Sequence, residues 1–158
     1  MIPLEIADLT AEFFEEAFQA RVDATVLVDH NTGTTGRARF RLSGDATLPR
    51  TVFVKLAPFD ERQREFVTAA GMGVAEARFY RDLAQEVPVR VPRPYLAQTD
   101  GDRYVMVLED LEAVGCRFPV RRILTSSGVG ATSSSTSRRC TLSTGSLPGW
   151  MTPAISAG

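Results

Sequence analysis

The spacing of apolar residues predicts helices in three parts of the chain. In the first, Thr10 is placed to cap the helix and Leu9 to pack against Phe14 across the first turn. In the second, Asp60 is the expected capping residue, and a Gly-Met-Gly sequence separates this helix from the third. We expect helices over residues 9–22, 60–66 and 74–86.

Runs of β-branched and aromatic residues predict five strands. The first two surround the turn-rich sequence DHNTGTTG, and the last two are separated by Gly101 and Asp102, so the latter pair is typical of a hairpin. The expected strands cover residues 24–28, 38–42, 51–57, the end of 87–98, and 104–108. This order of elements indicates an α+β fold, in which a five-stranded antiparallel sheet with a packed helix is preceded by an N-terminal helix.

The charge of the chain changes sign after Glu112. The residues up to this point include 13 basic and 19 acidic side chains, a net charge of −6, whereas residues 113–158 contain five Arg and no acidic residue. Residues 119–158 are rich in Ser, Thr and Gly and lack hydrophobic periodicity, which is typical of disorder. We therefore predict a folded unit over residues 1–118 and a disordered tail over 119–158.

The tail has a second interpretation, a shifted reading frame. Read one nucleotide out of register, permitted codons for Ser137–Ser156 can spell LAALHAVYWESPRLDDPGDL. The single codons of Trp150 and Met151 make the two consecutive Asp obligatory, and Cys140 allows His or Tyr at its alternative position. Because this reading restores acidic residues and a helical apolar pattern, we expect a frameshift, with a natural flexible tail as the alternative.

Composition argues against several classes of function. No apolar run approaches the roughly 20 residues needed to cross a bilayer, and the first ten residues lack the basic and apolar blocks of a signal peptide. With one His and two widely separated Cys, neither a zinc site nor a disulfide framework is expected. We expect a cytoplasmic protein whose partners include neither membranes nor nucleic acid.

One lysine stands among 17 arginines, and it lies inside the strand sequence VFVKLA. The compact ammonium of Lys55, on its flexible stem, differs from the planar arginine side chain and suits a site among phosphates. The alternative is a lysine that protects an edge strand from aggregation.

Glu76 lies on the helix that follows this strand. Tyr80 and Leu83 recur at i+4 and i+7, so Glu76 can face the sheet, where a buried carboxylate needs a cation and Lys55 is available. A lysine on a strand and a glutamate on the next helix hold nucleotide phosphates in kinases. The alternative is an ordinary solvated helix residue.

The loop Asn31–Gly36 is a candidate for phosphate contact. Gly33 and Gly36 would let the backbone approach a ligand, and Thr34 and Thr35 offer hydroxyl and amide groups. A simple hairpin turn would have a similar composition.

Four segments in this order, VFVKLA, EARFYRDLA, VPRPYLAQ and YVMVLEDL, resemble the N-terminal lobe of aminoglycoside-phosphotransferase-like kinases over residues 9–118, especially the choline- and ecdysteroid-kinase-like branch. The resemblance implies a protein-kinase-like lobe of a family whose intact members bind ATP with Mg²⁺. We expect weak ATP binding or none by this chain, because a lobe alone supplies one wall of the cleft and no metal ligand. The resemblance also implies that Phe53 stacks on adenine and that the connector LEDLE, with Glu109 and Leu111, binds adenine through its backbone. The out-of-frame LAALHAVYW is similar to the first large-lobe helix of the same family.

The family's catalytic loop, with its Asp base and Asn metal ligand, and its later metal-binding Asp have no counterpart in this chain. We therefore expect a truncated ATP-dependent small-molecule phosphotransferase, inactive alone, whose intact form moves the γ-phosphate to a hydroxyl acceptor. No catalytic or metal-ligating residue is assigned. We also expect an isolated lobe to expose apolar surface around YVMVLEDL.

Two other functions remain open from the sequence. The first is a non-catalytic nucleotide- or partner-binding module with a genuine basic tail. The second is a small α+β interaction domain in which Lys55 and Glu76 form a structural ion pair and nothing more.

Overall fold

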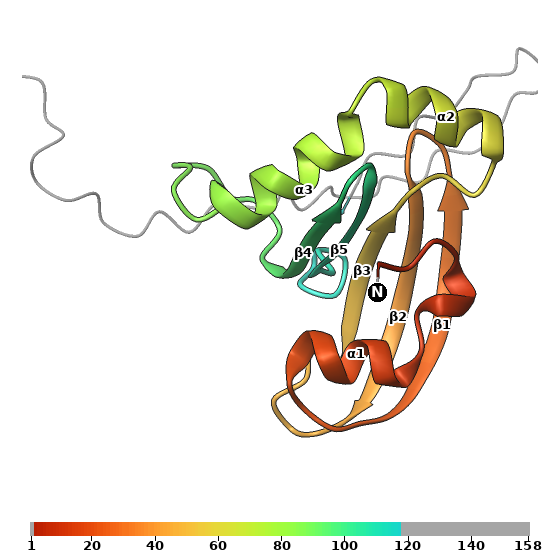
Figure 1. The fold of residues 1–158 in the computed structure, drawn as a ribbon. Helices are drawn as coiled ribbons and strands as arrows, with labels where there is room; N and C mark the ends of the chain where they lie inside the picture. Colours follow the sequence, from red (N-terminus) through yellow and green to blue (C-terminus); the bar gives the residue numbers. More distant parts are fainter. Residues whose placement is uncertain (1, 118–158) are drawn as a thin grey trace, which may run out of the picture. The chain divides into compact units, whose positions relative to one another are not determined.

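The computed structural model describes residues 2–117, so the predicted tail over 119–158 lies outside the described residues. The contacts within the chain define two units, Met1–Val114 and Gly115–Gly158. The first unit has an α+β fold, with a five-stranded antiparallel sheet and, within the described residues, three α-helices (Figure 1). This confirms the expected fold class at that level.

The strands are arranged in the order β1-β2-β3-β5-β4, which makes β3 the central strand and β1 and β4 the edges. All four strand pairs are antiparallel. The elements are the 3-10 helix η1 (Ile6–Asp8), α1 (Ala11–Phe18), β1 (Val22–Thr32), β2 (Gly36–Gly44), β3 (Thr51–Leu56), α2 (Glu61–Ala69), α3 (Met72–Asp82), β4 (Pro94–Asp100) and β5 (Arg103–Glu109).

The first helix begins as predicted and ends earlier. The Thr10 hydroxyl oxygen accepts a hydrogen bond from the Phe13 amide at 3.4 Å, which confirms the cap. The helix ends at Phe18 because Gln19 adopts a left-handed conformation with φ of 51°. Val22, expected in the helix, instead begins β1, where it is buried in the sheet core.

The polar loop between the first two strands is shorter than expected. Residues 29–32 belong to β1, and the turn is confined to Gly33–Thr35. Polar side chains are compatible with this strand because β1 is an edge strand and most of its residues are exposed.

The second and third helices also differ from their predicted bounds. The Asp60 carboxylate accepts a hydrogen bond from the Gln63 amide at 3.0 Å, as predicted for the cap, but α2 continues to Ala69. Gly71, with φ of 63°, then separates α2 from α3. Gly73, which the sequence suggested was part of the interruption, lies inside α3.

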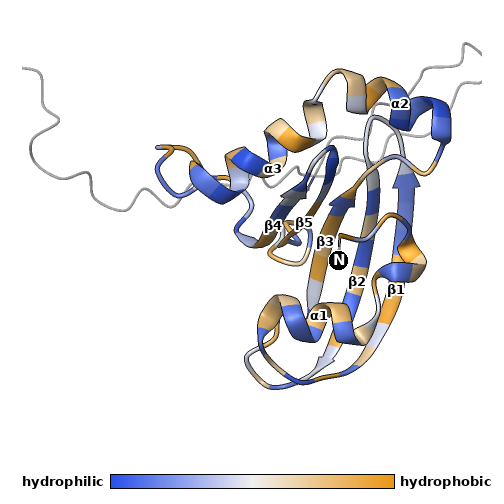
Figure 2. Ribbon diagram, in the orientation of Figure 1, coloured by the Kyte–Doolittle hydropathy of each residue, from blue (hydrophilic) through white to orange (hydrophobic). Residues whose placement is uncertain are grey.

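Two apolar layers cover the sheet, one on each face. On the first face, α1 packs through Phe14 against alternate residues of the strands; the buried members of this layer from β3 and β5 are Val52, Val54, Leu56, Val105 and Val107. On the second face, α3 contacts β4 and β5; its buried layer consists of Ala57, Ala77, Tyr104, Met106 and Leu108. The alternation of apolar and polar residues along the strands is visible in Figure 2.

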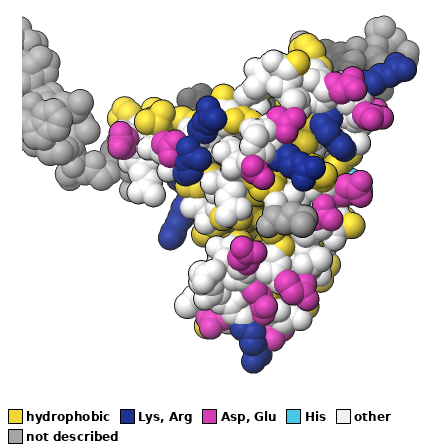
Figure 3. All heavy atoms as spheres, in the orientation of Figure 1, with side chains coloured by type: hydrophobic (Ala, Val, Ile, Leu, Met, Phe, Trp, Pro, Cys, Tyr) yellow, Lys and Arg dark blue, Asp and Glu magenta, His cyan; other side chains and the backbone are white. Residues whose placement is uncertain are grey.

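β5 is therefore buried on both faces, and each residue of Tyr104–Leu108 is at most 3% exposed. Tyr104–Leu108 therefore presents no apolar surface itself, because the helices of the lobe cover it; an exposed apolar side chain that follows it is Val114. Figure 3 shows instead acidic side chains gathered over α1, which contributes Glu12, Glu15 and Glu16. No helix within residues 2–117 is long and apolar enough to cross a membrane.

Replacing Phe14 tests the first layer. Its side chain is fully buried and its ring lies 5.3 Å, centroid to centroid, from that of Phe40. We expect Phe14→Ala to lower the free energy of unfolding by about 3–5 kcal/mol, measured by urea denaturation. Phe66→Ala is the matched control: because this ring is 67% exposed, the change should stay within about 0.5 kcal/mol. Equal losses from the two variants would contradict the packing of α1 on this face.

Candidate functional site

Lys55 and Glu76 form an ion pair between the central strand and α3. The Lys55 Nζ donates a hydrogen bond to Oε1 of Glu76, and the two side chains remain 18% and 32% exposed. The alternation of β3 leaves Phe53 and Lys55 half-buried on the same face, opposite to the fully buried Val52 and Val54. The predicted pairing of Lys55 with Glu76 is thus confirmed as geometry, and Phe53 lies on the same face of the sheet as Lys55.

Gly73 allows α3 to approach the sheet closely enough for this pair to form. A Cβ atom on Gly73 would lie 1.9 Å from Cε1 of Tyr104, a distance that no side chain tolerates. Gly73 precedes Glu76 by three residues, so both lie on one side of the helix. This contact was not predicted from the sequence, in which the available signal was a small residue one turn before Glu76 on the sheet-facing side.

Tyr104 places a buried hydroxyl beside the pair. Its oxygen is buried and has no hydrogen-bond partner among residues 2–117. Burial, and to a lesser degree the negative charge of Glu76, raise the pKa of Tyr104 to about 12. The same two causes raise the pKa of Tyr80. Together with burial, the negative charge of Glu76 thus raises the pKa of both Tyr104 and Tyr80, and Glu76 itself is ion-paired with Lys55.

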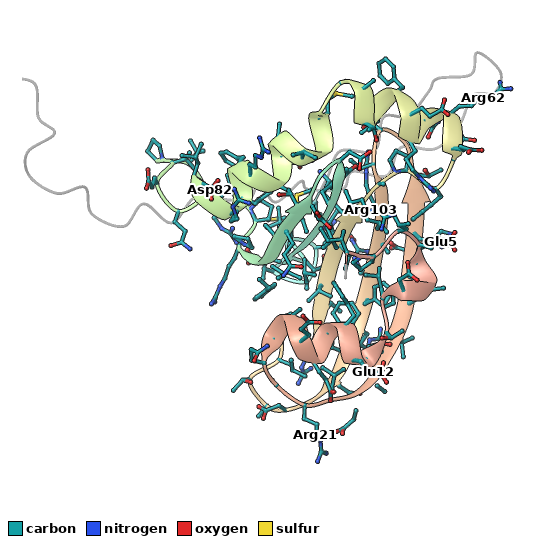
Figure 4. The ribbon with its side chains drawn as sticks, in the orientation of Figure 1. Glu5, Glu12, Arg21, Arg62, Asp82 and Arg103 are labelled. Atoms are coloured by element: carbon teal, nitrogen blue, oxygen red, sulfur yellow. The ribbon has the colours of Figure 1, made fainter. Side chains whose placement is uncertain are left out.

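The turn Gly33–Thr35 lies beside α2. Gly33 and Thr34 line a hollow of about 340 Å³ together with four α2 residues: Arg62, Gln63, Phe66 and Val67. Arg62 extends outward from the helix (Figure 4). Thr35 is 7% exposed, and a Cβ on Gly36 would lie 2.6 Å from the Ala57 carbonyl oxygen. The glycine at position 36 therefore serves contact within the protein.

Glu109, the last residue of β5, is held by hydrogen bonds of both its backbone and its carboxylate. The Glu109 amide donates to the Arg93 carbonyl at 2.8 Å. Burial alone would raise the pKa of Glu109, but hydrogen bonds from the Arg90 guanidinium and the Arg93 amide lower it. Because this amide is engaged, any contact of Glu109 with adenine would have to use its carbonyl. Leu111 lies half-buried in the turn that follows.

A second charge cluster, centred on Arg39, was not foreseen. Arg39 Nη1 lies 3.0 Å from Asp29 and 2.9 Å from Glu112. Arg39 Nε lies 3.1 Å from Asp110 Oδ2, at an angle outside hydrogen-bond geometry. Arg39 is the cross-strand neighbour of Phe53. The cluster therefore holds Asp110 and Glu112, which follow β5, close to the strand position of Phe53.

Within the described residues, no group of three or more His, Cys, Asp or Glu side chains is arranged to hold a metal ion. Comparisons with protein-family models, with curated proteins and with solved structures gave no match. The interpretation of the site therefore depends on its own geometry.

Substituting Gly73 tests how closely α3 must approach the sheet. We expect Gly73→Ala to lower the free energy of unfolding by about 1–3 kcal/mol, because the added methyl group overlaps the Tyr104 ring. Helix propensity alone would give the opposite sign, a stabilisation of about 1 kcal/mol.

The control is the same substitution in a Tyr104→Ala background, where the ring is absent. There Gly73→Ala should be neutral or stabilising, and a double-mutant cycle from urea unfolding measures the difference. A stabilising Gly73→Ala in the original chain would contradict the contact.

Proposed function

We propose that this chain is the nucleotide-binding half of an ATP-dependent small-molecule phosphotransferase, with a protein-kinase-like N-terminal lobe. The observation that carries the proposal is the ion pair of Lys55 with Glu76, which joins the central strand to α3 on the face that also presents Phe53. A cytoplasmic location belongs to the same proposal.

The position of Lys55 argues against a protective edge lysine. β3 lies between β2 and β5, so its backbone groups are paired on both sides and need no protection. A partly buried ion pair also adds little net stability, because the cost of removing both charges from water offsets much of their attraction. A role for Lys55 beyond stability is therefore the better explanation of a lysine at this central position.

The spacing of Phe53 and Lys55 fits an extended ligand with a planar end and an anionic end. Two residues along a strand span about 7 Å. The ring of Phe53 offers an apolar, aromatic surface, and the ammonium of Lys55, still 18% exposed, can reach an anion. A nucleoside phosphate lying along β3 has this division of apolar and charged groups.

The lobe would bind and orient the nucleotide without performing phosphoryl transfer. Residues 2–117 contain no cluster of acidic side chains suited to Mg²⁺, so no step through a metal is derived from them. Positioning and charge neutralisation account for most of the catalysis of phosphoryl transfer. Lys55 would contribute charge neutralisation, and the hydroxyl acceptor and catalytic base would come from elsewhere.

A second candidate function is a partner-binding α+β module in which the ion pair is structural. It is favoured by the turn Gly33–Thr35, which faces α2, and by the engaged amide of Glu109. The two candidates predict different effects of removing the Lys55 ammonium: weaker nucleotide binding for the first, and a change of stability alone for the second.

Nucleotide binding by the full chain distinguishes them. We expect Lys55→Met to weaken the binding of Mg²⁺·ATP by about tenfold or more in isothermal titration calorimetry, because the ammonium that neutralises phosphate is lost. Arg103→Gln, on an exposed residue of β5, removes the same charge away from Lys55 and is the control. Absence of ATP binding to the original chain, with Lys55→Met changing stability alone, would establish the structural candidate instead.

A further inference from the structure

We propose that Arg37 is a second cationic residue of this site and that the site therefore takes a chain of at least two phosphates. The ligand class would be nucleoside di- and triphosphates rather than monophosphates. The nucleoside part of this ligand rests on the proposed function. The phosphate part rests on the placement of Arg37 beside Lys55.

The strand register brings Arg37 and Lys55 together. They are direct cross-strand partners in the β2–β3 pair, so their side chains leave the same face of the sheet, with Cβ atoms about 5 Å apart. From there the two heads diverge. The Lys55 ammonium turns to Glu76 on α3, whereas Arg37 Nε donates to the Thr35 hydroxyl oxygen at 3.4 Å.

Arg37 is also placed against the turn. Its Nη2 would lie 3.6 Å from a Cβ atom built on Gly33, an ordinary contact distance, so the guanidinium lies directly beside this residue of the turn. Arg37 is exposed, and its nitrogens beyond Nε are directed toward the tip of the hairpin. These donors can form the paired hydrogen bonds that arginine makes with phosphate.

The balance of charge favours an anion at this position. Like charges placed directly opposite each other on neighbouring strands are unfavourable. Glu76 compensates Lys55, but no ion pair among residues 2–117 includes Arg37. Arg39, the next arginine on this face, contacts three carboxylates. Arg37 thus retains a positive charge that a bound phosphate would neutralise.

The side chains of Arg37 and Lys55 start from neighbouring positions, but their charged groups lie apart and differ in shape. Such a pair suits two phosphate groups. The ammonium of Lys55 can neutralise one group as a point charge, and the guanidinium of Arg37 can bind the next through two donors. Because the two heads diverge, a single phosphate bound by Arg37 would lie away from the Lys55 ammonium, and a second phosphate would be needed to reach it.

The test compares Arg37→Gln with Arg41→Gln by calorimetry on the full chain. Arg41 lies on the same strand and the same face, is exposed like Arg37, and faces Thr51 rather than Lys55 across the β2–β3 pair. The ligands are inorganic tripolyphosphate, ATP and AMP. We expect Arg37→Gln to weaken tripolyphosphate and ATP binding by about tenfold or more, and Arg41→Gln by less than about twofold. AMP should respond little to either change.

Three results would overturn the inference. Equal effects of the two substitutions would indicate diffuse attraction by a basic face, and an equal loss for AMP and ATP would indicate a single-phosphate site. Failure of the original chain to bind tripolyphosphate would also reject it. If tripolyphosphate depends on Arg37 but ATP binds no more tightly than tripolyphosphate, the phosphate site stands and the nucleotide function fails. If the binding of ATP depends on Lys55 but not on Arg37, the nucleotide function stands and the role of Arg37 in phosphate binding is rejected.

Discussion

The burial of β5 on both faces is the constraint on which the rest of the fold depends. A strand with five successive apolar residues, Tyr104–Leu108, cannot be left with one face in water, so a layer must cover each side. α1 supplies one layer through Phe14, and α3 supplies the other through Ala77. The close approach of α3 in turn requires Gly73, and this approach brings Glu76 within reach of Lys55.

The second layer is smaller than the first, and this difference creates the candidate site. α3 contacts β4 and β5, at one side of the sheet. On the same face, β2 and β3 carry Arg37, Arg39, Phe53 and Lys55, which remain half-buried or exposed. Apolar residues thus occupy the part of the face beneath the helix, and charged residues the part beside it, so the Lys55–Glu76 pair forms at their boundary.

Local signals in the sequence predicted the fold better than the site. The caps at Thr10 and Asp60 and the alternation of β3 depend on neighbouring residues, and all three are observed. The contacts of Arg39 with Asp110 and of Gly73 with Tyr104 join distant parts of the chain, and they depend on strand register and helix approach, which no local pattern specifies. Lys55 and Glu76 are the exception: their pairing was expected because a carboxylate on the sheet-facing side of a helix needs a cation, and Lys55 on the preceding strand was available.

The arginines of β2 show how the placement of acidic residues determines which part of this face can accept an anion. A bulge in β1 sets Asp29 opposite Arg39, and the connector after β5 adds Asp110, so the charge of Arg39 is already compensated. Phosphate could bind there only by separating these ion pairs, one of which involves a carboxylate that is 4% exposed and costly to leave unpaired. Arg37, two residues away, faces Lys55 and has a neutral hydroxyl as its partner. The same residue type on the same strand is therefore structural at one position and available to a ligand at the other.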